Sequence, residues 1–144
     1  MPKIAELFEN MTYGPAPESS ASAQAWLDAH NRQFDLFINN QWVKPADESY
    51  LSVANPATGK EVAKVADAKS PDIDKAVKAA QKAFTSWSAL SPHQRARHMY
   101  AISRNIQKHQ RLLSVVESID NGKSIRETRD IDIPLVARHF YHHA

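Results

Sequence analysis

Residues 50–87 read YLSVANPATGKEVAKVADAKSPDIDKAVKAAQKAFTSW and decide the fold class, because the pattern changes here from strand to helix. Two strand-like runs, residues 50–54 and 61–66, stand on either side of NPATGK. Within that linker Pro56 fixes φ, and Gly59 can take the left-handed backbone conformation that a tight turn needs. The first half of the stretch therefore predicts a β-hairpin.

The second half of the stretch predicts an amphipathic helix. Ser70 can serve as its N-cap, and Pro71 at the first helical position has no backbone N–H to leave unpaired. Asp72 and Asp74 favour the positive end of the helix dipole. The apolar residues that follow at helical spacing share one face of the helix: Ile73, Val77, Ala80 and Phe84.

A shorter hairpin is predicted upstream, in DLFINNQWVKP at residues 35–45. Apolar residues 36–38 precede Asn39-Asn40, and Trp42-Val43 follow. Asparagine tolerates positive φ better than most residues, so the Asn pair suits a type I′ turn.

Residues 1–33 are expected to form a leader ahead of a domain at residues 34–144. The leader begins with a helical pattern at residues 1–11 and continues into turn-prone Gly14, Pro15 and Pro17. A short helix should follow, started by Glu18, Ser19 or Ser20, with three apolar residues on one side: Ala23, Trp26 and Leu27.

Downstream of residue 90 the sequence predicts further helices with clear start and stop signals. Ser91 and Gln94 have capping-box spacing, and Ser124 with Glu127 repeats it. Asn121-Gly122 is a usual helix end. These helices carry apolar stripes, at Met99, Ile102 and Ile106, at Leu112, Leu113, Val116 and Ile119, and at Leu135, Val136 and Phe140.

The last helix should be separated from the one before it. Pro134 is expected to break or kink the chain near Ile133, and Asp132 can cap the final helix. No alternation of strand and helix is long enough to predict a parallel sheet. The amphipathic helices therefore lack an obvious sheet to pack on, which indicates that more polypeptide belongs to this fold.

Composition excludes several kinds of site. The chain has no cysteine, which rules out disulfides, zinc thiolate sites and a cysteine nucleophile within it. Its three glycines, Gly14, Gly59 and Gly122, lie too far apart for a dinucleotide-binding glycine loop, a P-loop or a nucleophile elbow.

Charge and hydropathy give no sign of a nucleic acid or membrane partner. The 18 Lys and Arg residues nearly balance 16 Asp and Glu residues, for a net charge of +2. No apolar run approaches the roughly 18 residues that span a bilayer, and residues 1–11 lack the apolar core of a secretory signal. A cytoplasmic location is expected.

Two clusters are candidate sites. His139 and His143 have i, i+4 spacing, as in helical zinc sites, with His142 beside them, but Phe140 stands where such a motif has Glu. We interpret them as a helix end instead. The run ESIDNGKSIRETRD at residues 117–130 alternates in charge and could hold an acid–base pair of carboxylates, but surface ion pairs explain it more simply.

Five blocks in order, FINNQWV, NPATGKEVAKVADA, DIDKAVKAAQKAFTSW, ESIDNGKSIRET and DIPLVARHFYHHA, resemble the N-terminal third of an NAD(P)-dependent aldehyde dehydrogenase. The similarity covers residues 36–144. Residues 13–34, YGPAPESSASAQAWLDAHNRQF, and residues 106–118, IQKHQRLLSVVES, are more specifically similar to the family-sixteen branch.

The resemblance implies an α/β fold, the incomplete N-terminal portion of a Rossmann-type cofactor domain made of β-hairpins and amphipathic helices. It implies oxidation of an aldehyde by NAD or NADP, with a homo-oligomer as the complete enzyme. In the family the nucleophilic cysteine, the glutamate base, the oxyanion-hole asparagine and the cofactor turn all lie downstream. No catalytic or cofactor-binding residue can be assigned to this chain.

One metal site is implied by the same resemblance. Many members hold a structural monovalent cation with backbone carbonyls ahead of the NP motif and with the aspartate of DNGK. The matching positions are Val53, Ala54 and Asp120. A helix-end cap is the alternative role for Asp120.

Two functional hypotheses follow. The chain is the N-terminal part of an aldehyde dehydrogenase and is catalytically incomplete alone. Alternatively, it is a non-catalytic interaction module that binds a dehydrogenase subunit through its leader and apolar helix faces.

Overall fold

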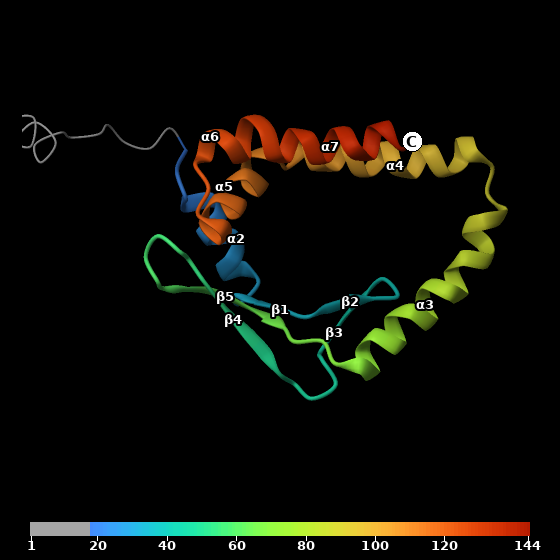
Figure 1. The fold of residues 1–144 in the computed structure, drawn as a ribbon, viewed down its shortest axis with the longest axis horizontal. Coiled ribbons are helices and arrows are strands. Elements are labelled where there is room, and N and C mark those ends of the chain that lie inside the picture. Colours follow the sequence, from blue (N-terminus) through green and yellow to red (C-terminus); the bar gives the residue numbers. More distant parts are fainter. Residues whose placement is uncertain (1–17) are drawn as a thin grey trace, which may run out of the picture.

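A computed structural model describes residues 18–144 of the chain; the predictions for residues 1–17 lie outside them. Strands lie on one side of the molecule and the antiparallel pair α4 and α7 on the other, with α2 and α5 connecting them at one end and α3 at the other (Figure 1). The elements are α2 (Ala21–Ala29), β1 (Gln33–Phe34), β2 (Leu36–Ile38), β3 (Gln41–Val43), β4 (Tyr50–Ala54), β5 (Glu61–Ala66), α3 (Ser70–Ala89), α4 (Pro92–Lys108), α5 (Gln110–Asn121), α6 (Ile125–Glu127), the π-helical turn η1 (Thr128–Asp132) and α7 (Ile133–His142).

Both predicted hairpins are confirmed. Strands β2 and β3 pair antiparallel across Asn39 and Asn40, which have φ of 53° and 61°, as a type I′ turn requires. Strands β4 and β5 pair antiparallel over the predicted residues, and Gly59 takes φ of 68° in their linker. The turn residues and the strand-like runs beside them were enough to locate these strands, because both signals depend only on neighbouring residues.

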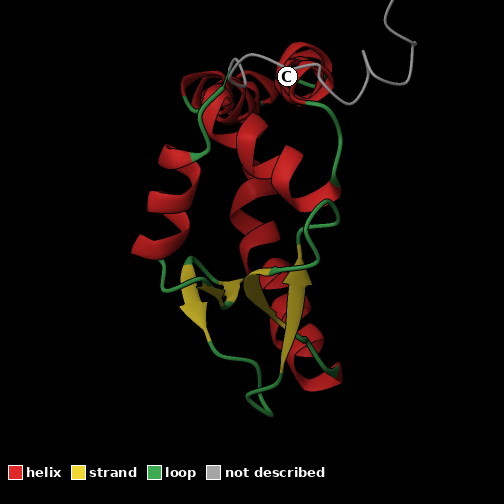
Figure 2. Ribbon diagram, turned by 90° about the vertical axis from the view of Figure 1, so that its left-hand side faces the viewer, coloured by secondary structure: helices red, strands yellow, loops and turns green. Residues whose placement is uncertain are grey.

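One short parallel pairing is present that the sequence did not predict. Strand β1 pairs in parallel with β5, Gln33 opposite Lys64 and Phe34 opposite Val65, so the larger sheet has the order β1-β5-β4. Figure 2 shows these short strands in the lower part of the molecule, with most of the helices above them. Strand β1 could not be predicted from sequence, because two residues are too few to show a periodicity.

Residues 18–33 pack into the same core as the rest of the chain. Helix α2 contributes Ala23 and Leu27, which are 0% and 2% exposed. Arg32 then fixes the helix to the sheet, since its Nη1 donates to the Val62 carbonyl at 3.0 Å and its Nη2 donates to Gln24 Oε1 at 2.7 Å. The guanidinium also pairs with Asp28 at 2.7 Å.

The apolar core of the described residues is small and made mainly of alanine. Besides α2 it includes Ala63, Ala96, Val115 and Ala137. Small side chains let α4 and α7 approach closely, and buried Ser103 donates from Oγ to the Ala137 carbonyl at 2.8 Å. In this part of the chain no helix is long and apolar enough to cross a membrane.

Helix α3 is hardly packed. Of its 20 residues only Asp72 is buried. The predicted apolar stripe lies on this helix as expected. The described residues do not cover it, since Ile73, Val77 and Phe84 are 53%, 48% and 64% exposed. A face of this kind needs further protein surface to pack on.

The start of α3 depends on Asp72, and Lys69 rather than Ser70 is its N-cap. Both carboxylate oxygens of Asp72 accept from the Ala46 N–H at 3.1 Å, and Oδ2 also accepts from the Lys69 N–H at 3.2 Å. This carboxylate reaches back one turn and draws Ser70 into the helix, so the predicted boundary is wrong by one residue.

The region around Pro134 also differs from the prediction. The chain does not break there, because the π-helical turn η1 precedes α7 and accommodates the missing N–H of proline. Asp132 has helical backbone angles and does not cap α7. Its Oδ2 instead accepts from Lys123 Nζ at 2.8 Å.

Replacing buried Asp72 should destabilise the fold more than replacing exposed Asp74. The Asp72→Ala variant leaves two backbone N–H groups without acceptors, so the free energy of unfolding should fall by about 1–2 kcal/mol. The exposed Asp74→Ala variant, in the same helical turn, should cost less than about 0.5 kcal/mol. Urea unfolding of both variants measures the difference, and equal losses would contradict the assigned role.

Candidate functional site

The terminal histidines lie at an exposed helix end. His139 and His142 belong to the last turns of α7 and His143 follows as its C-cap. The rings of His142 and His143 meet edge to face with centroids 5.1 Å apart. Residues 18–144 contain no group of three His, Cys, Asp or Glu side chains able to hold a metal ion.

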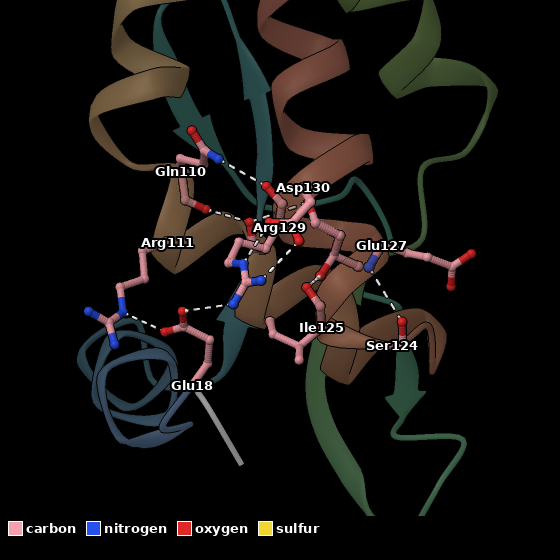
Figure 3. A network of polar contacts seen from close by, with 10 residues as sticks. Glu18, Gln110, Arg111, Ser124, Ile125, Glu127, Arg129 and Asp130 are labelled. Carbon is pink, nitrogen blue, oxygen red and sulfur yellow. Dashed lines mark hydrogen bonds and ion pairs between the residues drawn. The ribbon is translucent and has the colours of Figure 1, made fainter.

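Three of the charged residues at 117–130, Lys123, Arg129 and Asp130, form ion pairs. Arg129 donates from Nε and Nη2 to Asp130 at 2.7 Å and 2.9 Å, and this pairing holds the pKa of Asp130 below its ordinary value (Figure 3). Lys123 has a raised pKa because it donates to Asp132. Both groups keep their charge near neutral pH, which suits ion pairing rather than acid–base exchange.

The same cluster fixes the segment before α2 to the helices. Glu18 pairs with Arg111 at 2.6 Å and approaches Arg129 at 3.6 Å (Figure 3). Gln110 Nε2 donates to the Arg129 carbonyl at 2.9 Å, and buried Ser114 donates to the Gln110 carbonyl at 2.7 Å. The cluster therefore joins three elements and has a structural role.

The fold brings the DNGK turn to the NPATGK linker. Gly122 ends α5 with φ of 78°, and a Cβ on it would lie 2.7 Å from Cγ of Pro56. The linker follows Val53 and Ala54, where the β4–β5 ladder has an irregular register. Val53 and Ala54 are distant in sequence from the end of α5, but the linker that follows them contacts Gly122 through Pro56.

Asp120 itself does not cap the helix. The C-cap of α5 is Gly122, whose N–H donates to the Ser118 carbonyl, and Asn121 Oδ1 accepts from the Lys123 N–H at 2.8 Å in the turn that follows. Within residues 18–144 the exposed Asp120 side chain makes no hydrogen bond or ion pair. The alternative role proposed for Asp120 from sequence is therefore wrong, and its carboxylate is available to a cation.

The comparisons with known proteins agree with this arrangement. The model of the family described as "Aldehyde dehydrogenase family" matches residues 42–144. The chain belongs to the aldehyde dehydrogenase family. The predicted fold, hairpins and amphipathic helices of an incomplete N-terminal portion, is confirmed.

Three solved structures show the extent of the similarity. A putative aldehyde dehydrogenase from Burkholderia cenocepacia is 35% identical with a TM-score of 0.75, over 76% of this chain and 22% of that chain. A variant of the aldehyde dehydrogenase from Bacillus cereus is 30% identical with a TM-score of 0.78, over 92% and 26%. A variant of aldehyde dehydrogenase C from Pseudomonas syringae, complexed with NAD+ and octanal, is 34% identical with a TM-score of 0.72, over 74% and 22%.

The chain thus spans about a quarter of the length of the enzymes that it matches. The matched region corresponds to an incomplete, N-terminal portion of the family fold, and the family includes NAD-bound members. The nucleophilic thiol of the implied reaction is not in this chain, which has no cysteine.

The contact at Gly122 can be tested with a matched pair of glycines. Gly122→Ala should lower the free energy of unfolding by about 2–4 kcal/mol, because it adds a clash with Pro56 to the strain of positive φ. Gly59→Ala, at φ of 68° with no atom within 4 Å of its Cβ position, carries only the backbone strain. That variant should lose about 1–2 kcal/mol. Thermal or urea unfolding measures both, and equal losses would mean that the linker and the DNGK turn are not in contact.

Proposed function

We propose that this chain supplies the N-terminal part of an NAD(P)-dependent enzyme that oxidises an aldehyde to a carboxylate. The main support is the family match over residues 42–144. The cysteine thiolate, the water-activating glutamate and the oxyanion hole of that chemistry belong to further polypeptide, whereas this portion provides helices and strands that pack around the cofactor domain. It contributes structure rather than reacting groups.

The finer features of the complete enzyme belong to the same proposal. It acts in the cytoplasm as a homo-oligomer, and takes NAD or NADP as its oxidant. The leader and residues 106–118 support the family-sixteen branch by their sequence alone. The proposed division remains a leader at residues 1–33 and a domain portion at residues 34–144.

The exposed face of α3 supports the second candidate, a non-catalytic module that binds a dehydrogenase subunit. Ile73, Val77 and Phe84 are available to another polypeptide as much as to a continuation of this one. The mass of the native protein in its source cells distinguishes the two hypotheses. It can be measured after detection with an antibody against the leader. A protein several times larger than 16.2 kDa supports the dehydrogenase portion, and one of 16.2 kDa supports the module.

The purified chain should not oxidise aldehydes by itself. With an aliphatic aldehyde and NAD+ or NADP+, we expect no aldehyde-dependent increase in the absorbance of reduced nicotinamide, because no thiol is present to attack the carbonyl. A full-length family member assayed beside it is the positive control. Turnover by homogeneous chain would contradict the proposed division of chemistry.

We also propose that Val53, Ala54 and Asp120 hold a structural monovalent cation. The contact between Gly122 and Pro56 supports this, and so does the unpaired carboxylate of Asp120 among the described residues. Backbone carbonyl and carboxylate oxygens are suitable ligands for a hard cation. The role is structural, with no part in the reaction.

Cation binding should stabilise the fold by mass action, by about 2.7 kcal/mol at one hundred times the dissociation constant. The melting temperature should therefore rise when KCl or NaCl replaces choline chloride at equal ionic strength. Asp120→Asn should reduce that rise, whereas the exposed Asp74→Asn variant should keep it. An equal rise in both variants would exclude Asp120 from the site.

A further inference from the structure

An apolar groove lies where α2, α5 and the last two turns of α4 meet (Figure 1). It has a volume of about 360 Å³ and is lined mainly by Trp26 from α2, Ile102 and Ile106 from α4, and Leu112 and Leu113 from α5. Residues 18–144 leave the groove open, since Ile102 and Leu113 are 41% and 36% exposed. A cavity of about 150 Å³ holds a benzene ring, so this groove has room for about two large apolar side chains.

The chain that precedes residue 18 ends beside this groove. The Glu18 side chain is 12% exposed and pairs with Arg111 at 2.6 Å and with Arg129 at 3.6 Å. Arg111 directly precedes Leu112 on α5, and α2, which carries Trp26, begins three residues after Glu18. The ion pairs therefore fix the end of the preceding segment next to two of the three helices that line the groove.

Residues 1–11, MPKIAELFENM, carry an apolar stripe that suits the groove. Ile4, Leu7, Phe8 and Met11 have i, i+3, i+4 and i+7 spacing, which places them on one side of a predicted helix. The charged residues fall on the other side: Lys3, Glu6 and Glu9. A helix this short is marginal in water by itself and needs an apolar surface to pack on.

The connection between this stripe and Glu18 is long enough to reach the groove. Residues 12–17 can span about 20 Å when extended, whereas the nine residues of α2 are about 14 Å long. Gly14 and Pro15 in this connection favour a turn, which lets the chain reverse its direction beside α2. A tether this short holds the segment at an effective concentration in the millimolar range, which favours it over a second copy of the chain.

We propose that residues 1–11 form an amphipathic helix that lies in this groove, with the side chains of Leu7 and Phe8 between α2, α4 and α5. The occupant is the chain's own N-terminal segment, held there by the short tether to Glu18. It removes the exposed parts of Ile102 and Leu113 from water and buries no charge of its own. This inference does not depend on the dehydrogenase reaction.

Disulfide cross-linking tests the placement, because the chain has no cysteine of its own. The full chain is prepared with Leu7→Cys and Leu113→Cys together and is oxidised at low protein concentration. A matched chain carries Glu6→Cys with Leu113→Cys, which places the first thiol on the other side of the predicted helix. The intramolecular disulfide should form about tenfold faster in the first chain, because only residue 7 faces the groove.

Two results of the cross-linking would overturn the proposal. Equal rates in the two chains would show that the stripe does not face the groove. A disulfide-linked dimer as the main product at low protein concentration would show that a second copy supplies the occupant.

Thiol reactivity gives a second measurement that needs no cross-link. The single thiol of Leu113→Cys should react with a maleimide about tenfold more slowly than in a chain where Leu7→Asp and Phe8→Asp also remove the stripe. Val136→Cys on α7, where the native side chain is 41% exposed, is the control whose rate should not respond to the stripe. Amide NMR spectra check that each variant keeps the fold. Equal rates at position 113 with and without the stripe would also overturn the proposal.

Discussion

One constraint governs this structure: the described residues offer its amphipathic helices too little apolar surface to pack on. Full burial of a side chain such as Ile73, Val77 or Phe84 contributes about 1.5–3 kcal/mol. These three are about half exposed, so α3 alone forgoes roughly 2–5 kcal/mol, against a total stability of about 5–15 kcal/mol for a typical domain. Burial of this one face against further polypeptide would therefore add a large fraction of the stability of a typical domain.

Many of the helices and strands are joined by polar contacts rather than by apolar packing. Arg32 connects α2 to β5, Asp72 connects α3 to the segment after β3, and Ser103 connects α4 to α7. Each contact is directional but contributes only about 0.5–1.5 kcal/mol, or somewhat more where a charge is involved. They fix geometry well and stabilise weakly, as expected of a portion of a fold whose larger apolar interface lies elsewhere.

Sequence was a good guide wherever structure depends on neighbouring residues. The Asn39-Asn40 turn, the Gly59 linker and the Ser91 capping box each specify the backbone over a few residues, and all three were predicted. Strand β1 and the π-helical turn were not, because pairing with Lys64 and accommodation of Pro134 depend on residues brought together by folding. The burial of Leu27 was hidden for the same reason, although its place on one side of a short helix was predicted.

The candidate sites also differ in how far they could be predicted from sequence. The absence of cysteine settles from sequence alone that this chain brings no thiol to the implied reaction, whatever its fold. Whether Asp120 caps a helix could be decided only from the structure, in which Gly122 is the C-cap of α5 and the Asp120 side chain makes no hydrogen bond with the described residues.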